Sequence, residues 1–467
     1  MLISLISALC INNSLYILIL AAVSFILLLI FKKELLFAVL LGFLISSIII
    51  NTEVNPKYGP LADDIGNPFD CELLVTEVDY GSKNNIAICE ILNRNKNKVQ
   101  VYLYGEELPE VNDVISVKRL KLKSPADSPP EYAYFDRYLK SKGIRYTAYL
   151  DKKCYHISAH NKGTFPLKQA RSLNSFLNNK IQETFTNERT SSFIQGLLLG
   201  NEDNFSDDDY NAFKDAGCLH IVAVSGYHVM LLLGILAVFL KRFPGFLRDI
   251  INILFLLALV FITGCSPSVI RAVAMVIITI ISLYLKRDRD ALNSLCLVAI
   301  LYIISNRYII YNASFVLSFT ATFGIIMNSG YLSELFSPLP DILKNPIVAT
   351  LSAQIGVFPA SMLYFGTLST YSIVPNIIIS FTVPLIFMLT PLALLSNFKP
   401  ILMICDFLCN FIFKTSYIVS NAPLSTINFK TNNLFLIVVT LSSVLICFAL
   451  YQLQIKSFRK NLKEKTH

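Results

Sequence analysis

The sequence contains few charged residues. Asp, Glu, Lys and Arg make up 15% of its 467 residues, whereas soluble globular proteins carry about 25%. Hydrophobic residues account for 54% and fall in blocks at 2–50 and from about 219 to 454, with a polar stretch between them. This pattern excludes an ordinary soluble protein and indicates an α-helical polytopic membrane protein.

Several other features are missing. A cleavable signal peptide is not expected, because no basic region precedes Leu2, the apolar block continues to Phe31 and no small-residue cleavage site follows. The chain has no nucleotide-binding loop of the G-x-x-x-x-G-K-[ST] type, so any ATP-driven pulling requires a partner protein. Its ten cysteines form no regular framework. One pair among Cys71, Cys89 and Cys154 could form a disulfide in an oxidising compartment.

The apolar blocks predict about eleven membrane-spanning helices, since each needs about 20 apolar residues. The segment 400–420 is the weakest, because Lys414 interrupts it. The predicted spans are 12–31, 34–50, 219–240, 249–264, 267–285, 290–305, 309–328, 346–366, 371–396, 400–420 and 433–453.

Basic residues predict the orientation of these helices. They cluster at 32–33, 241–248, 286–289 and in the tail 455–467. With eleven spans all four clusters fall on one side, which is the cytoplasmic side by the positive-inside rule. These loops account for the net charge of +8, and residues 51–215 are then extracytoplasmic.

The polar stretch divides into two predicted parts. Residues 51–165 contain short alternating segments with turns between them, which predict a small β-barrel interrupted by a helix at about 131–142. Residues 166–215 predict an amphipathic helical connector that could lie on the membrane surface. Its apolar positions are Phe176, Ile181, Phe185, Phe193 and Leu197.

The predicted span 219–240 carries unusual polar residues. Treated as one helix, it places His220, Ser225 and His228 within an arc of about 140°, with Gly226 beside them. Ionisable groups at membrane depth normally face a protein interior or a wet cavity, so these residues either line a pathway or bond to neighbouring helices. A Ser225–His228 nucleophile pair lacks an acidic partner nearby. No catalytic or metal-binding residue is assigned.

Other spans also carry polar groups. Ser266, Ser268 and Arg271 lie near a helix start marked by Pro267, which suits a phosphate; alternatively, Arg271 extends toward the interface. Ser314, Ser318 and Thr322 form a seam at helical spacing, which favours helix–helix hydrogen bonding. Gln354 and Asn376 lie near prolines, which mark broken or kinked helices. Gln354 and Asn376 complete the set of candidate site residues.

These residues occur in motifs that resemble the ComEC family of competence proteins. The strongest is Gly217-Cys-Leu-His220-Ile-Val-Ala-Val-Ser225-Gly226-Tyr-His228-Val. Further similar runs follow in the same order, over about residues 35–450. They are Gly264-Cys-Ser-Pro-Ser268-Val-Ile-Arg271-Ala, Arg289-Asp290-Ala-Leu-Asn293, Ala313-Ser-Phe-Val-Leu-Ser-Phe319, Ala353-Gln354-Ile-Gly-Val-Phe-Pro359 and Pro375-Asn376.

The resemblance implies a channel for single-stranded DNA in natural transformation. Residues 216–454 would form the channel domain, and the barrel at 51–165 would be an OB-like domain that guides DNA. The channel is expected to be lined or braced by His220, Ser225, Gly226, His228, Ser266, Ser268, Arg271, Gln354 and Asn376. DNA guidance is expected from Arg94, Lys96, Lys98, Lys118, Arg119, Tyr102 and Tyr104, by charge and base stacking. Those tyrosines could equally be ordinary barrel packing.

The chain departs from the family in two places. Tyr227 replaces the usual leucine, and no H-x-H-x-D-H run supplies the metallo-β-lactamase-like domain found in many members. We therefore expect no enzyme activity and no cofactor. The implied partners are single-stranded DNA, the bilayer, a DNA receptor, a cytoplasmic motor protein and a second copy of the chain. A small-molecule or lipid transporter, or a degenerate remnant, remains the alternative.

Overall fold

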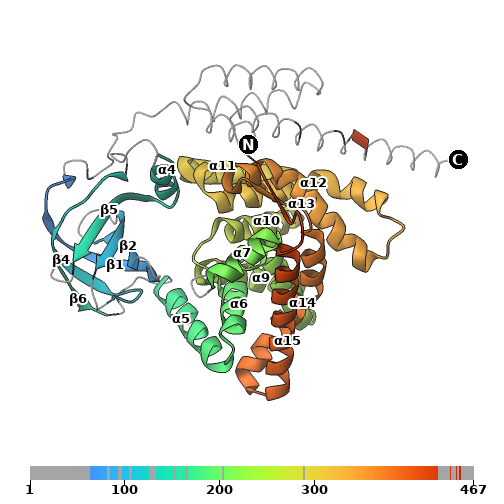
Figure 1. Ribbon diagram of the computed structural model, residues 1–467, viewed down its shortest axis with the longest axis horizontal. Coiled ribbons are helices and arrows are strands. Elements are labelled where there is room, and N and C mark those ends of the chain that lie inside the picture. The colour runs from blue at the N-terminus through green and yellow to red at the C-terminus, as the bar shows by residue number, and fades with distance from the viewer. Residues whose placement is uncertain are drawn as a thin grey trace. The chain divides into compact units, whose positions relative to one another are not determined.

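The computed structural model describes residues 61–429, with short gaps at 62–63, 81–84, 93–96, 105–107, 126–132, 152–153, 161, 163–166, 202–204 and 288–289, and a few isolated residues beyond 429. The predicted spans 12–31 and 34–50, nearly all of 433–453 and the tail 455–467 lie outside the described residues. The chain divides into two compact units (Figure 1). One holds the chain up to Thr164 together with Cys296–Ala313, and the other holds Phe165–Leu295 and the chain from Ser314 onward.

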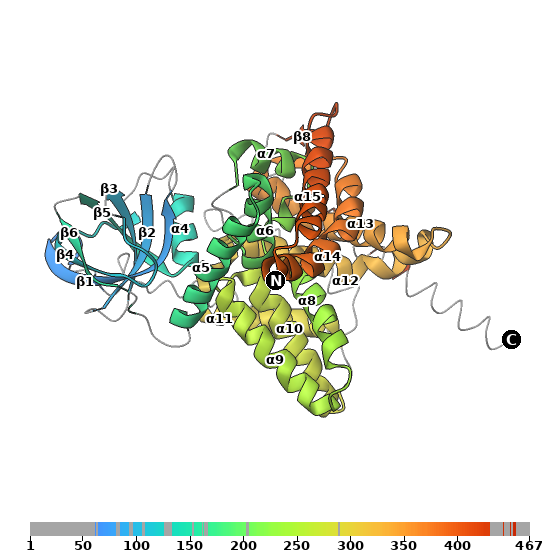
Figure 2. The same cartoon turned by 90° about the horizontal axis from the view of Figure 1, so that it is seen from below.

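The first unit is built on a six-stranded sheet. Its spatial order is β5-β3-β2-β1-β4-β6 (Figure 2). All pairs are antiparallel except β3 and β5, which are parallel. One face buries an apolar core that includes Leu73, Val75, Cys89 and Tyr146, because side chains alternate between the two faces of a strand. The strands are β1 (Phe69–Tyr80), β2 (Asn85–Ile91), β3 (Lys98–Tyr104), β4 (Val114–Leu120), β5 (Ile144–Asp151) and β6 (Tyr155–Ala159).

All six strands lie within residues 51–165, where the sequence predicts short strands, but the barrel is not confirmed. The described ladders end at β5 on one edge and at β6 on the other. Only an isolated bridge joins Lys123, just after β4, to Thr147 of β5, so the described sheet curls without closing. Closure depends on pairing between segments distant in sequence, which strand periodicity does not specify.

Cys71, Cys89 and Cys154, which lie in or beside the sheet, form no disulfide with one another. Cys71 and Cys89 are buried in the sheet core. Burial raises the pKa of the Cys89 thiol well above its ordinary value. The disulfide considered from the sequence is therefore not formed among these residues.

A hydrogen-bonded contact joins the helix of this unit to a segment distant in sequence. Helix α4 (Ala133–Ser141) ends with carbonyl groups that accept hydrogen bonds from outside the helix. The Asn306 Nδ2 group donates to the carbonyl oxygens of Lys140 and Ser141 at 3.1 and 2.8 Å. Asn306 lies between α11 (Ala291–Ser305) and the 3-10 helix η5 (Arg307–Tyr311).

Two cation–π contacts reinforce this junction. The Arg137 guanidinium lies 5.2 Å from the centre of the Tyr311 ring, and the Lys140 ammonium lies 5.5 Å from that of Tyr308. Contact with α4 places η5, which leads into α12 (Ala313–Leu335), beside the helix of the sheet.

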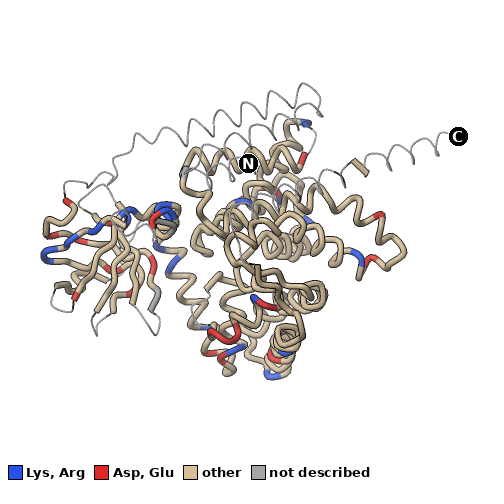
Figure 3. The backbone as a smooth tube through the Cα atoms, turned by 45° about the horizontal axis from the view of Figure 1, so that its top comes forward, with Lys and Arg blue, Asp and Glu red and all other residues tan. Residues whose placement is uncertain are grey.

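The second unit consists mainly of helices. Six described helices are long and apolar enough to cross a membrane, and α8 and α11 are shorter apolar helices. In Figure 3 the helical unit is mostly free of charged residues, which gather near turns and on the sheet. The helices are α5 (Leu167–Thr184), α6 (Glu188–Leu199), α7 (Asp207–Asp215), α8 (Gly226–Leu240), α9 (Gly245–Ile262), α10 (Pro267–Tyr284), α12, α13 (Asp341–Phe365), α14 (Ile373–Ser396) and α15 (Lys399–Ser420).

These helices match eight of the predicted spans to within several residues at their ends. The count of eleven is not confirmed, because three of the predicted spans lie outside the described residues. The 400–420 segment forms one continuous helix despite Lys414. Strands β7 (Thr367–Ser369) and β8 (Thr426–Asn428) pair antiparallel, so the segments that follow α13 and α15 lie side by side.

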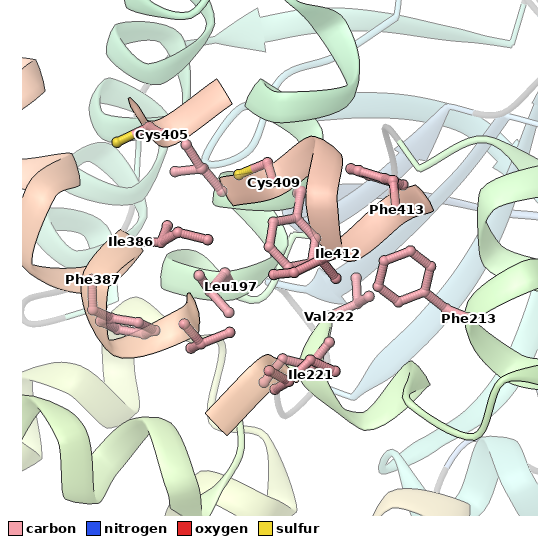
Figure 4. Close-up of a cluster of buried hydrophobic side chains, with 14 of the residues drawn as sticks. Leu197, Phe213, Ile221, Val222, Ile386, Phe387, Cys405, Cys409, Ile412 and Phe413 are labelled. Carbon is pink, nitrogen blue, oxygen red and sulfur yellow. The ribbon is translucent and has the colours of Figure 1, made fainter. Parts of the chain in front are cut away.

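The connector prediction is wrong for α6. Instead of lying on a surface, this helix is buried along most of its length. Phe193 packs against Phe213 of α7 and Phe413 of α15, with ring centres 5.9 and 5.7 Å apart. Figure 4 shows this core, where Leu197, Ile221 and Val222 meet residues of α14 and α15. Amphipathic spacing identified the apolar face, but the partner of that face came from tertiary packing.

We predict that Asn306→Ala will loosen the α4 junction. The Lys140 and Ser141 carbonyl groups lose the hydrogen bonds from Asn306 Nδ2, each of which contributes about 0.5–1.5 kcal/mol. Hydrogen–deuterium exchange should rise in the peptide that covers α4. The control is Asn421→Ala, since Asn421 Nδ2 bonds to Tyr417 in its own helix, and it should leave α4 unchanged. Equal exchange in both variants would contradict the role of Asn306.

Candidate functional site

The residues of the strongest motif straddle a break in the helix. The predicted helix from 219 is wrong: a 3-10 turn, η4 (Leu219–Ile221), is followed by non-helical residues, and α8 begins only at Gly226. Ser225 has extended backbone angles, φ −127° and ψ 176°. Its amide donates to His228 Nδ1 at 2.8 Å, so His228 takes the place of the Glu or Gln of a capping box. His220 and Ser225 therefore do not share a helix face with His228.

Tight contacts with neighbouring elements hold the non-helical segment. Ser268 Oγ donates to the Val224 carbonyl oxygen at 2.8 Å, and Cys218 Sγ lies 3.4 Å from Ser416 Oγ. On the α6 side, an added Cβ at Gly196 would lie 2.9 Å from the Val222 carbonyl oxygen. Non-helical backbone at membrane depth is tolerated only where protein or a wet cavity covers it. Here helices α6, α10 and α15 cover it.

Gly217 begins this segment with backbone geometry that suits glycine. Its φ is +73°, a left-handed conformation that other residues rarely adopt. An added Cβ would lie 2.6 Å from Ser372 Cβ and 2.8 Å from Ser369 Cβ. The glycine thus permits close contact with the segment between α13 and α14.

Arg271 forms a second contact centre one turn into α10. Its side chain is buried, with 8% of the residue exposed. Nε donates to Ser318 Oγ at 2.9 Å, and Nη1 donates to Thr322 Oγ1. The guanidinium also lies 5.9 Å from the centre of the Phe319 ring. The arginine therefore points inward, and the alternative that it extends toward the interface is wrong.

Gly226 makes room for this arginine. An added Cβ at Gly226 would lie 2.9 Å from Arg271 Nη2. Gly226, Arg271, Ser318 and Thr322 thus come together from three helices, and the first three of these residues lie in three separate motifs. The seam of Ser318 and Thr322 was expected to bond between helices, and the structure identifies Arg271 as the donor. Ser314 of the same seam is exposed.

His228, in the first turn of α8, is fully buried. Because Nδ1 accepts from the Ser225 amide, the imidazole carries its proton on Nε2 when neutral. Its ring lies against Phe387 with centres 5.4 Å apart, and Nε2 has no hydrogen-bond partner among the described residues. His228 therefore braces the start of α8 and reaches no solvent in this conformation. His220, in contrast, is exposed on η4.

Ser266 and Ser268 mark the start of α10. Ser266 is the N-cap residue, and Pro267 occupies the first turn as the sequence predicts. Their hydroxyl oxygens lie 3.3 Å apart. Ser268 also bonds the Val224 carbonyl oxygen, just before α8 begins.

Gln354 and Asn376 belong to a separate contact. Gln354 Nε2 of α13 donates to Ser372 Oγ, at the N-cap of α14. Asn376 follows in the first turn of α14, and its Oδ1 is buried with no bond among the described residues. The prolines inside α13 and α14 do not end these helices. Sequence spacing gave no signal for the role of Ser372 or Gly217.

The sheet presents a stacked tyrosine pair. Tyr102 of β3 and Tyr149 of β5 have ring centres 4.8 Å apart and nearly parallel planes. The Lys123 ammonium lies 4.7 Å from the centre of the Tyr149 ring, and Gln100 donates to Tyr102 Oη at 2.9 Å. Tyr104 and Tyr149 are about half exposed. Neighbouring strands thus bring together an aromatic and basic surface.

The other residues expected to guide DNA are more scattered. Arg94 and Lys96 lie outside the described residues. Lys98 is half-buried, whereas Lys118 and Arg119 are exposed on β4, three strands away from β3 in the sheet. The sequence prediction missed the pairing of Tyr149 and Lys123 with Tyr102. Tyr146 is the tyrosine that packs inside, where its hydroxyl accepts from the Leu61 amide at 2.8 Å.

One family-like motif is explained by local structure. Asp290 Oδ1 accepts from the amides of Leu292 and Asn293 at 2.8 and 3.1 Å, and Asn293 Nδ2 donates to Asp290 Oδ2 at 2.9 Å. These bonds cap the start of α11. Among the described residues, no group of three His, Cys, Asp or Glu side chains is arranged to hold a metal ion.

We predict that Gly226→Ala will destabilise the helical unit. The new methyl group displaces a guanidinium held by two hydroxyl groups, and overpacking of this kind costs about 1–3 kcal/mol. The apparent thermal midpoint in detergent should fall. Gly234→Ala is the control on the same helix, since an added Cβ there meets nothing within 4 Å. A midpoint that falls equally in both variants would contradict the packing argument.

Comparisons with known proteins complete this description. Over 192 residues the chain is 29% identical to ComE operon protein 3 of Bacillus subtilis (strain 168), which covers 40% of this chain and 24% of that protein. It is 28% identical over 191 residues to an uncharacterized protein of Aquifex aeolicus (strain VF5), which covers 40% of this chain and 46% of that protein. The matches thus span about a quarter and just under half of these two relatives. No solved structure matches.

The family profile described as "Competence protein" matches residues 197–454, more than half of the chain. This region contains the break before α8, the Arg271 centre and the Gln354 contact. The described apolar helices agree with a multi-pass membrane protein. The chain therefore belongs to the competence protein family.

Proposed function

We propose that this chain forms the path by which single-stranded DNA crosses the cytoplasmic membrane during natural transformation. The observation that carries the proposal is the segment 217–225, which forms no α-helix although it lies among membrane helices in the family-matched region. Irregular backbone of this kind is found where a membrane protein lines or braces a pathway. Membership of the competence family supports DNA as the substrate.

The N-termini of helices α8, α10 and α14 suit a polyanion. Serine is the N-cap residue of α8, α10 and α14, at Ser225, Ser266 and Ser372. A helix N-terminus carries a partial positive charge and free amide donors, which favour phosphate. Arg271 adds a full positive charge beside α8. A strand with one negative charge per nucleotide would meet favourable electrostatics at this end of the helices.

The candidate residues then take different roles. His220, being exposed, is proposed to line the path. Ser225, Gly226, His228, Ser268 and Arg271 brace the segment behind it through the contacts described above. Ser266, Gln354 and Asn376 lie at the starts of α10 and α14 or bond to them, and they are proposed to hold the path walls in place.

The sheet unit is proposed to act as an OB-like guide outside the membrane. The parallel pairing of β3 and β5 and the bridge from Lys123 to Thr147 support a curled sheet of that kind. Its stacked tyrosines and Lys123 provide the aromatic and basic groups that bind single strands. The predicted orientation places this unit on the extracytoplasmic side and the C-terminus in the cytoplasm.

Other proteins complete the proposed system. A DNA receptor would deliver the strand, and a cytoplasmic motor would pull it, because the sequence lacks a nucleotide-binding loop of its own. We propose no catalytic role for this chain. The Ser225–His228 pair is poorly suited to nucleophilic catalysis, since His228 Nδ1 already accepts from the Ser225 amide.

We predict that deletion of this chain will stop DNA entry while labelled DNA still accumulates outside the cell. Arg271→Ala, which removes the buried cation and its two hydroxyl contacts, should lower entry at least about tenfold at equal membrane abundance. His220→Ala should lower entry without lowering thermal stability. Ser314→Ala is the control, because this serine is exposed on the helix that carries Ser318.

The measurement is the ratio of cytoplasmic to surface-bound labelled DNA in competent cells. Unchanged entry after deletion would exclude the channel function and favour a transporter or a remnant. Unchanged entry in the Arg271→Ala variant would exclude this arginine from the path.

We predict that Tyr149→Ala will weaken binding of an oligodeoxythymidine strand to the purified full chain. Base stacking on an aromatic ring contributes about 1–3 kcal/mol, so the dissociation constant should rise roughly 5- to 150-fold. Fluorescence anisotropy of a labelled oligonucleotide measures this. Tyr210→Ala on α7 is the control, because Tyr210 is exposed in the other unit. Equal affinities in the two variants would exclude the stacked pair as a binding surface.

A further inference from the structure

Two segments about 40 residues apart come together at one end of the helical unit. One is the turn between α8 and α9, and the other is the end of α10 (Figure 2). Tyr284 Oη donates to Asp249 Oδ2 at 2.7 Å. The Phe246 and Tyr284 rings meet edge to face, with centres 6.2 Å apart. We call residues 239–250 and 284–287 the basic tip.

The basic tip exposes a dense group of cations. It contains five basic residues and one acidic residue, Asp249, which accepts from Tyr284. All five basic side chains are exposed, namely Lys241, Arg242, Arg248, Lys286 and Arg287. Charges of one sign at this density repel each other, so their arrangement is favoured where an anion lies among them.

Part of this charge has a local explanation. Helices α8 and α10 both end here, and a helix C-terminus favours a nearby cation. Lys286, with φ +51°, turns the chain at the end of α10. One cation at each helix end would satisfy that preference. The tip has five, brought together from two segments by the Tyr284 contacts.

Apolar side chains surround these cations. Phe239, Phe246 and Tyr284 are each more than half exposed. The exposed apolar surface continues away from the tip along α9, an apolar helix. It includes Leu247, Ile250, Leu254 and Leu257. Nucleic-acid surfaces also combine aromatic and basic groups, but a continuous aliphatic face beyond them is typical of contact with lipid tails.

We propose that the basic tip is a binding site for anionic phospholipid headgroups. The phosphate of the lipid would lie among the five cations, and its tails would lie along the exposed face of α9. Polybasic segments beside membrane helices attract anionic lipids in this way. The site is separate from the Arg271 centre, and its test does not depend on DNA transport.

The test uses the purified full chain in phosphatidylcholine nanodiscs doped with cardiolipin or phosphatidylglycerol. Native mass spectrometry counts the lipids retained. The variant changes Lys241, Arg242, Arg248, Lys286 and Arg287 to glutamine together. Retention of the anionic lipids should fall at least about tenfold relative to the unchanged chain, while retention of phosphatidylcholine stays the same. Lys399→Gln, an exposed cation at the start of α15, is the control and should retain both lipids normally.

Further experiments distinguish binding of lipid from binding of other anions. Inorganic phosphate at millimolar concentration should not displace the lipid, because it lacks the tails that contact α9. If the five-residue variant fails to fold, Arg248→Gln and Arg248→Lys take its place, and only the glutamine variant should lose lipid. Equal anionic-lipid retention in variant and unchanged chain would overturn the proposal. So would an oligodeoxythymidine that binds at the tip while lipid retention is unaffected by the substitutions.

Discussion

The helical unit depends on satisfying the backbone of a segment that is not helical. Residues from Gly217 to Ser225 run among membrane helices, where unpaired amide and carbonyl groups are costly. Ser268 bonds the Val224 carbonyl, and His228 accepts the Ser225 amide. Gly196 lets the Val222 carbonyl approach α6 closely. Each of these residues lies in a different element, so the break requires several helices to assemble around it.

The same constraint explains why a buried arginine lies beside the break. Because α8 begins at Gly226, without a side chain, the Arg271 guanidinium has space above its first turn. Ser318 and Thr322 then accept its hydrogen bonds. An isolated cation at membrane depth is costly, and hydroxyl groups on a neighbouring helix reduce that cost. The arrangement links the starts of α8 and α10 to α12.

Helix α12 also continues directly from the segment that contacts the sheet unit. Asn306 and η5 hold α4, and Ser318 lies a few residues further along the same chain. Within the first unit this contact is made by hydrogen bonds and cation–π contacts rather than by a large apolar core. The chain that binds Arg271 is therefore covalently continuous with the segment that anchors α4.

The sequence by itself determined the class of protein, because hydrophobic block length is a local property. It predicted eight described helices and most strands, and motif order identified the family. It also placed Ser318 and Thr322 on a polar seam. It could not show that α6 is buried, that α8 begins at Gly226, or that the seam accepts from Arg271. Those facts depend on which helices pack together. The pairing of Tyr102 with Tyr149 likewise follows from the parallel contact of β3 and β5, segments about 40 residues apart whose register no local pattern fixes.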